Sequence, residues 1–140
     1  MNLNVKTIYA MIAIGELTLN HGKSFLKASD ISSKYNIPPR FLELTLNDLK
    51  TNGIINSKRG AKGGFYILKN PEEITLFDII NVTEASTKVF ECEPLQNKHL
   101  CVFKNIFDDL NNTIIDFFKS ITAVKIAETI RDKNTVDFII

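Results

Sequence analysis

The sequence of 140 residues contains no run of about 18 consecutive apolar residues, the length that a membrane-spanning helix requires. Its first residues do not form the apolar stretch of a secretory signal peptide, so we expect a cytoplasmic protein without a membrane partner. Only two cysteines are present. In that compartment they would be thiols, metal ligands or a redox pair rather than a structural disulfide.

Histidine is as scarce as cysteine, and the chain holds only His21 and His99. The sequence has no phosphate-binding loop, no zinc-ligand spacing and no serine, histidine and aspartate set that resembles a catalytic triad. Two histidines and scattered acids on a helical chain do not form a catalytic constellation. The sequence therefore argues against an enzyme.

Positive charge is concentrated in one half of the chain. Residues 1–70 hold 10 Lys and Arg against 4 Asp and Glu, a net charge of +6, whereas residues 71–140 hold 7 against 12, a net charge of −5. The formal net charge of +1 conceals this division. A polyanion such as nucleic acid would be attracted to the amino-terminal half alone.

Residues 57–67, Ser-Lys-Arg-Gly-Ala-Lys-Gly-Gly-Phe-Tyr-Ile, predict a tight and basic β-hairpin. Gly63 and Gly64 at its tip can adopt the positive φ that a short hairpin turn needs. No acidic residue lies nearby. Three cations lie on and around the tip, namely Lys58, Arg59 and Lys62.

A helix-turn-helix pattern precedes this hairpin. We expect a short helix over residues 29–35 that ends at Asn36 in the left-handed conformation, with Ile37 as the apolar residue of the turn. Pro38-Pro39 then opens a second helix, because the amides of a first helical turn have no intrahelical partner. This second helix is expected to stop at Asn52-Gly53.

A further helix is expected over residues 3–19, with an apolar face formed by Val5, Ile8, Ile12 and Leu19, joined by Tyr9 and Leu17. The helix, the helix pair and the basic hairpin follow one another in the order of a winged helix-turn-helix, whose natural target is duplex DNA. Two alternatives stay open: an ordinary α+β domain with a surface hairpin, and a protein-interaction domain that does not bind DNA.

The carboxy-terminal half predicts one more short helix and then a long one. Thr75 and Asp78 have the spacing of a capping box within residues 71–84. From about Cys101 a heptad seam begins, which a second copy of the chain would cover, unless the helix packs wholly onto its own domain. The seam consists of Phe103, Phe107, Leu110, Ile114, Phe117 and Ile121.

We therefore predict a mainly α fold with a small β-hairpin wing. Residues 1–84 would form the winged helix-turn-helix DNA-binding domain. Residues 85–101 would form a sensor loop, and residues 102–140 a long dimerisation helix with a carboxy-terminal tail.

Three motifs resemble the Rrf2 family of bacterial winged-helix regulators, which includes the IscR, NsrR and CymR types. The family usually has tyrosine where this chain has Phe65. The resemblance covers essentially the whole chain and implies a homodimeric, sequence-specific transcription regulator, expected to be a repressor. The motifs are Arg59-Gly60-x-x-Gly63-Gly64-Phe65, Phe41-Leu42-Glu43 and Glu73-Ile74-Thr75-Leu76-Phe77-Asp78-Ile79-Ile80.

The second helix of the pair would act as the recognition helix in the major groove. Pro39 and Arg40 stand at its start, where an arginine can bind guanine bidentately. Glu43, one turn further, could accept a hydrogen bond from the amino group of cytosine. The alternative is a solvated acid paired with Arg40 or Lys50.

The remaining predicted contacts lie on the hairpin and on the first helix of the pair. Arg59 would enter the minor groove, where narrow A·T-rich sequence favours an arginine. Lys58 and Lys62 would contact phosphates, which gives affinity without sequence preference. Lys27 and Ser29 would hold the DNA backbone.

Three interpretations of the cysteines remain open. The resemblance implies an iron–sulfur cluster in many members, for which Cys92 and Cys101 are the candidate ligands and His99 a weaker one. A two-cysteine site would favour a [2Fe-2S] cluster. The cysteines could instead form a reversible disulfide, if their Cα atoms lie within about 7 Å. They could also take no part in regulation.

The carboxy-terminal end suggests control by a protein partner. The chain ends Asp137-Phe138-Ile139-Ile140, which resembles the ending of the CymR type, a regulator without a cluster that works with cysteine synthase. The Ile140 carboxylate could bind backbone amides while its side chain fills a pocket. The alternative is a tail that packs on its own domain or is disordered.

Overall fold

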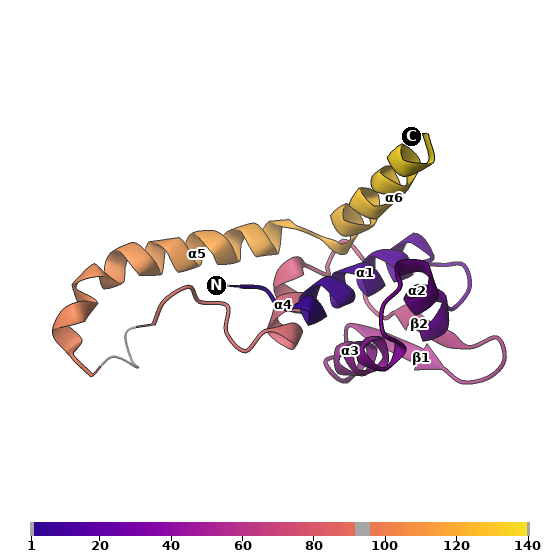
Figure 1. Ribbon diagram of the computed structural model, residues 1–140, viewed down its shortest axis with the longest axis horizontal. Helices are drawn as coiled ribbons and strands as arrows, with labels where there is room; N and C mark the ends of the chain where they lie inside the picture. Colours follow the sequence, from indigo (N-terminus) through magenta and orange to yellow (C-terminus); the bar gives the residue numbers. More distant parts are fainter. Residues whose placement is uncertain (1, 92–95, 140) are drawn as a thin grey trace.

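The computed structural model describes residues 2–91 and 96–139. Figure 1 shows a compact group of helices and a hairpin, from which one helix, α5, extends as an arm. The prediction of a mainly α fold with a hairpin wing is confirmed. The elements are α1 (Val5–Leu19), α2 (Ala28–Tyr35), α3 (Pro39–Thr51), β1 (Ile55–Lys58), β2 (Gly64–Ile67), α4 (Leu76–Thr83), the 3₁₀ helix η1 (Lys98–Phe103), α5 (Lys104–Ser120) and α6 (Ala123–Ile139).

The helix-turn-helix has the boundaries that its capping residues predict. Asn36 ends α2 in the left-handed conformation with φ of 53°, and the amide of Ile37 donates to Ser32 O at 3.0 Å. Ile37 is buried. Pro39 is the first residue of α3, and the helix gives way at Asn52 to Gly53, whose φ is 77°.

The buried face of α1 differs from the prediction. Val5 is 60% exposed and Ile8 46% exposed, so this part of the predicted apolar face is wrong. Apolar residues occupy most of the circumference of α1, and periodicity alone therefore does not select a face. Small residues decide which face of α1 is buried, because they let α4 and α6 approach that face closely. The buried residues of α1 are Thr7, Ala10, Ala13, Ile14, Gly15 and Leu17.

The hairpin pairs β1 with β2 in antiparallel register, from Ile55 opposite Ile67 to Lys58 opposite Gly64. Positive φ angles occur at Gly60 (118°) and Gly64 (148°). Gly63 does not have one, so the conformational role predicted for it is wrong. Gly63 is required for space, because a Cβ there would collide with the carbonyl oxygen of Lys58.

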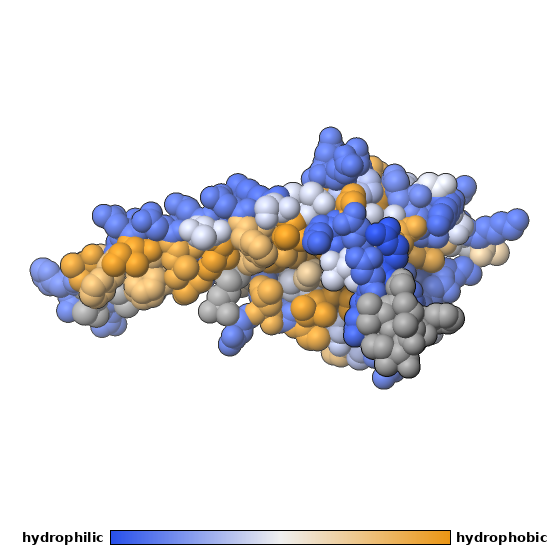
Figure 2. Space-filling view, turned by 90° about the horizontal axis from the view of Figure 1, so that it is seen from above, coloured by the Kyte–Doolittle hydropathy of each residue, from blue (hydrophilic) through white to orange (hydrophobic). Residues whose placement is uncertain are grey.

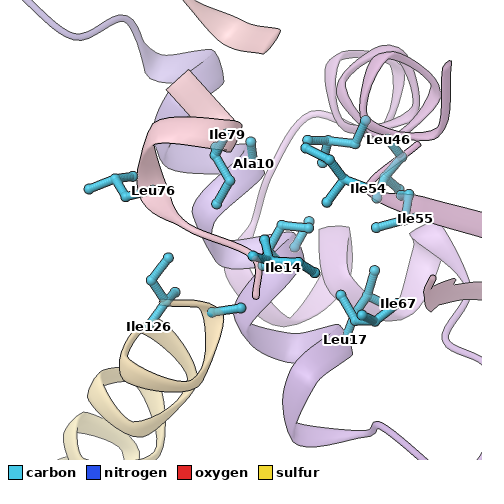
Figure 3. Close-up of a cluster of buried hydrophobic side chains, with 14 of the residues drawn as sticks. Ala10, Ile14, Leu17, Leu46, Ile54, Ile55, Ile67, Leu76, Ile79 and Ile126 are labelled. Atoms are coloured by element: carbon cyan, nitrogen blue, oxygen red, sulfur yellow. The ribbon is translucent and has the colours of Figure 1, made fainter. Parts of the chain in front are cut away.

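The hydrophobic core lies between α1, α3, α4, the base of the hairpin and α6 (Figure 3). The predicted capping box of α4 is present: the Asp78 amide donates to Thr75 Oγ1 at 3.2 Å, and the Thr75 amide donates to Asp78 Oδ2 at 2.9 Å. It directs the apolar face of α4 inward. Fully buried core side chains include Ile14, Leu46, Ile55, Ile79 and Ile80.

The long helix expected after residue 101 is present as α5, but it ends at Ser120, and a second helix, α6, follows it. The helix is interrupted at Ile121 and Thr122, because the main chain there forms hydrogen bonds with the main chain at the start of α4. The Leu76 amide donates to Ile121 O, and the Ala123 amide donates to Ile74 O, each at 2.8 Å. Helix α6 then packs along α1.

The expectation of a carboxy-terminal tail is wrong, because α6 continues to Ile139, whereas Ile140 lies outside the described residues. No helix in the described ranges has the length and apolarity that crossing a bilayer requires. The domain limits at residues 84 and 101 stay predictions.

Candidate nucleic-acid interface

Contacts within the chain involve the inner side of α3 and both of its flanks. Its inner side is buried through Leu42, Thr45, Leu46 and Leu49. One flank is joined to α1 by an ion pair between Lys6 and Asp48. The opposite flank is joined to β1, where Lys50 Nζ donates to Ser57 Oγ at 2.8 Å. The fourth side of α3 faces outward.

The outward side of α3 carries an exposed row, Arg40, Leu44, Asn47 and Thr51, at the spacing of successive helical turns. We call these four residues the outer row. Arg40 was predicted as a base-contacting residue, but Leu44 and Asn47 were missed. Their position opposite Leu42, Leu46 and Leu49 in the helical period was the signal that could have found them.

Two further predicted residues lie at the start and along one edge of this surface. Pro39 and Glu43 are both exposed. Across the described ranges no salt bridge joins Glu43 to Arg40 or to Lys50, whose amine binds Ser57 instead. The carboxylate of Glu43 is therefore available to accept a hydrogen bond from an outside donor.

The start of α2 presents Lys27 and Ser29, both exposed. The Lys27 amide donates to Asp30 Oδ2 at 2.9 Å, which orders the first turn. The far end of α2 is fixed to α1 through Glu16, which accepts from Lys34 Nζ at 2.8 Å and from the hydroxyl of Tyr35. Burial and Glu16 together raise the pKa of Tyr35, so this hydroxyl stays protonated and continues to donate.

The hairpin presents Lys58, Arg59 and Lys62, all exposed. Lys58 Nζ lies 5.6 Å from the centre of the Phe25 ring, which meets Tyr66 edge-on with a centroid distance of 5.2 Å. In the part of the chain that the structure describes, none of the three cations forms a salt bridge. Their charge is therefore available to a polyanion.

The helix pair and the hairpin form a winged helix-turn-helix. The outward side of its second helix is exposed, and the hairpin cations form no salt bridge in the described residues. The family model described as Rrf2, iron-dependent transcriptional regulator, matches residues 3–129. The chain belongs to the Rrf2 family. It is therefore a DNA-binding transcription regulator in a family of regulators rather than enzymes.

Individual relatives of this Rrf2 protein agree with the family assignment. A protein of Aquifex aeolicus named as an HTH-type transcriptional regulator is 31% identical over 132 residues, which cover 90% of each chain. The regulator IscR of Pectobacterium atrosepticum is 29% identical over 140 residues, covering 98% of this chain and 85% of the relative.

Solved structures confirm the fold. CymR, the global cysteine regulator of B. subtilis, superposes with a TM-score of 0.79 at 23% identity, covering 92% of this chain and 98% of that one. Staphylococcus aureus CymR gives a TM-score of 0.72 at 26% identity, covering 89% and 97%. The winged-helix architecture predicted from the sequence is thus confirmed.

The family's iron dependence raises the question of whether this chain's residues fit an iron–sulfur cluster. Cys101 is a half-buried cysteine in η1, His99 is exposed, and Cys92 lies outside the described residues. Within the described ranges, no three His, Cys, Asp or Glu side chains gather where they could hold a metal. Clusters are held by four thiolates in the common arrangement, and one chain supplies two cysteines. The described residues therefore do not fit a cluster.

Proposed function

We propose that this Rrf2 protein binds its operator as a two-fold dimer assembled by α5, with one recognition helix in the major groove of each half-site. An exposed apolar stripe that begins in η1 and continues along α5 carries the proposal. Phe103, Ile106 and Phe117 are 57%, 64% and 60% exposed. Figure 2 shows apolar side chains gathered along this arm. The stripe consists of Val102, Phe103, Ile106, Leu110 and Phe117.

The predicted heptad seam divides between two surfaces. Phe107 lies against Phe90 with ring centroids 4.7 Å apart, and Ile114 packs against the core beside the buried Phe118. Ile121 also packs against the core, but Phe103, Leu110 and Phe117 are exposed, which argues against a helix that packs wholly onto its own domain. An exposed patch of this kind marks an interaction surface, and a second copy of the stripe would cover it symmetrically.

The contacts with DNA follow from the surface of the helix-turn-helix and the wing. Arg40 would bind guanine and Glu43 would accept from cytosine in the major groove. Arg59 would enter the adjacent minor groove. Phosphate contacts would come from Lys27, Ser29, Lys58 and Lys62. A dimer would place two such surfaces on half-sites about one helical turn apart, near 34–36 Å.

A charge placed on the α5 stripe tests this proposal. Phe117→Glu should convert a dimer into a folded monomer, because the buried carboxylate in the dimer would have no partner. The same charge at Asn112, which is exposed on the polar side of α5, should leave the dimer intact. Light scattering measures the mass, and circular dichroism verifies the fold. A wild-type protein that is monomeric at micromolar concentration would overturn the proposal.

Operator binding provides the second measurement. Duplexes enriched from genomic fragments should bind the wild-type dimer and the Asn112→Glu variant equally. The Phe117→Glu monomer should lose the contribution of one half-site and bind far more weakly. Equal binding by all three proteins would show that α5 does not assemble the DNA-binding form.

Repression and the contact with cysteine synthase through Ile140 stay predictions from the family resemblance. Deleting Ile139 and Ile140 and measuring binding to cysteine synthase tests the second. If the deletion leaves that binding unchanged, the carboxy-terminal isoleucine is not the contact.

A further inference from the structure

The middle of the outer row of α3 is a leucine. Leu44 is 45% exposed and lies one helical turn after Arg40 and just before Asn47. The contacts of Asp48 with Lys6 and of Lys50 with Ser57 hold α3 on both flanks. They oppose a rotation of the helix that would bury Leu44. An exposed position in the middle of the outer row therefore carries no hydrogen-bonding group.

Leu44 belongs to a wider apolar surface at the start of α3. Phe41 is 60% exposed. With Leu44 it borders a hollow of about 230 Å³ between α1 and α3, to which Val5, Tyr9 and Pro38 also contribute. This surface continues the outer row toward α1.

Cations on the outer row and on the hairpin favour a polyanion as the partner of the outward side of α3. Arg40 stands on the same outer row. The hairpin cations Lys58, Arg59 and Lys62 lie at and beyond the end of β1, the strand that Lys50 joins to α3. A protein surface of ordinary charge would not match these cations, whereas duplex DNA would.

We propose that Leu44 reads the C5 methyl group of thymine in the major groove. This inference rests on the proposed operator binding and adds the base that the recognition helix selects. Among the major-groove edges of the four bases, only thymine presents a methyl group, and an apolar side chain in contact with it favours thymine. A leucine can neither donate nor accept, so it has no other means of distinguishing the bases there.

The position of this thymine relative to the other contacts is also constrained. Four residues of α-helix advance by about 6 Å, and base pairs are stacked about 3.4 Å apart. The thymine should therefore lie one or two base pairs from the guanine that Arg40 would bind. Asn47, a further turn along, has the carboxamide that pairs with adenine.

Replacing thymine by deoxyuridine removes only the methyl group and therefore tests the inference directly. Duplexes are first selected from a random library with the wild-type protein, and each thymine is then replaced singly. At one position in each half-site, deoxyuridine should weaken wild-type binding by about fourfold, the effect of one lost apolar carbon. Leu44→Ala should bind the thymine and deoxyuridine duplexes equally.

Leu68→Ala is the matched control, because Leu68 is 51% exposed and lies outside α3. It should retain the wild-type sensitivity to deoxyuridine. The inference is overturned if deoxyuridine is tolerated at every position, or if Leu44→Ala keeps the wild-type sensitivity, while the selected operator still binds. A library from which no sequence is enriched would instead overturn the proposed operator binding, and this inference with it.

Discussion

The main chains of Leu26 and Phe65 exchange two hydrogen bonds, with N···O distances of 3.1 and 2.7 Å. Leu26 comes just before α2, and Phe65 lies on β2, so the helix-turn-helix and the wing are joined directly. The contact from Lys50 to Ser57 joins α3 to β1 on the other strand. Together the two links fix the wing relative to the recognition helix, and a DNA reader that enters adjacent grooves requires this.

Gly64→Ala should loosen the wing. A Cβ at Gly64 would lie 2.5 Å from the carbonyl oxygen of Leu26, and the φ of 148° is unfavourable for alanine. We expect a loss of about 1–3 kcal/mol in the free energy of unfolding, measured in urea, and weaker DNA binding. Gly60→Ala is the control, because its φ of 118° is also strained but a Cβ there would meet nothing within 4 Å. Equal losses in both variants would show that the Leu26 contact is unimportant.

Arg59→Ala should weaken binding to operators with A·T-rich flanks. Loss of one cation from the DNA contact should lower the slope of log affinity against log salt by about one unit. Lys125→Ala removes the same charge from an exposed position on α6 and should leave the slope unchanged. Titrations at several salt concentrations provide the measurement, and an unaltered slope in Arg59→Ala would remove this residue from the interface.

Asn111→Leu should release the loop before η1 from α5. The buried Asn111 accepts from the Val89 amide at 2.8 Å and donates to Phe90 O at 3.2 Å. A leucine would leave both groups without a partner, at a cost of about 1–3 kcal/mol. Hydrogen exchange at the Val89 amide should accelerate. The exposed Asn112→Leu should not change it; similar acceleration in both variants would assign the effect to α5 as a whole.

We expect DNA binding that does not depend on iron or sulfide, because the chain supplies two cysteines, whereas the common cluster arrangement takes four thiolates. Protein purified without oxygen should therefore contain no stoichiometric iron and sulfide, and Cys101→Ser and Cys92→Ser should bind the operator like the wild type. Coloured protein whose iron and sulfide are lost in either variant would contradict this expectation and support the cluster predicted from the sequence.

The sequence by itself determined the features that depend on neighbouring residues. Asn36, Pro39 and Asn52-Gly53 set the limits of α2 and α3, and the pair Thr75 and Asp78 sets the start of α4. Caps act within one helical turn, so no distant contact was needed to predict them. The basic hairpin tip, and with it the family, was recognised in the same way.

The tertiary structure alone decided which of several apolar faces is buried and where the last helix breaks. Helix α1 is apolar around most of its circumference, yet Val5 and Ile8 are exposed whereas Ala10 and Ala13 are buried. Only the packing of α4 and α6 against α1 determines which of these residues are buried. The break at Ile121 depends on Leu76, far away in the sequence. The heptad pattern includes Ile121 and gives no sign of this break, because main-chain hydrogen bonds between distant segments leave no periodic trace in the side chains.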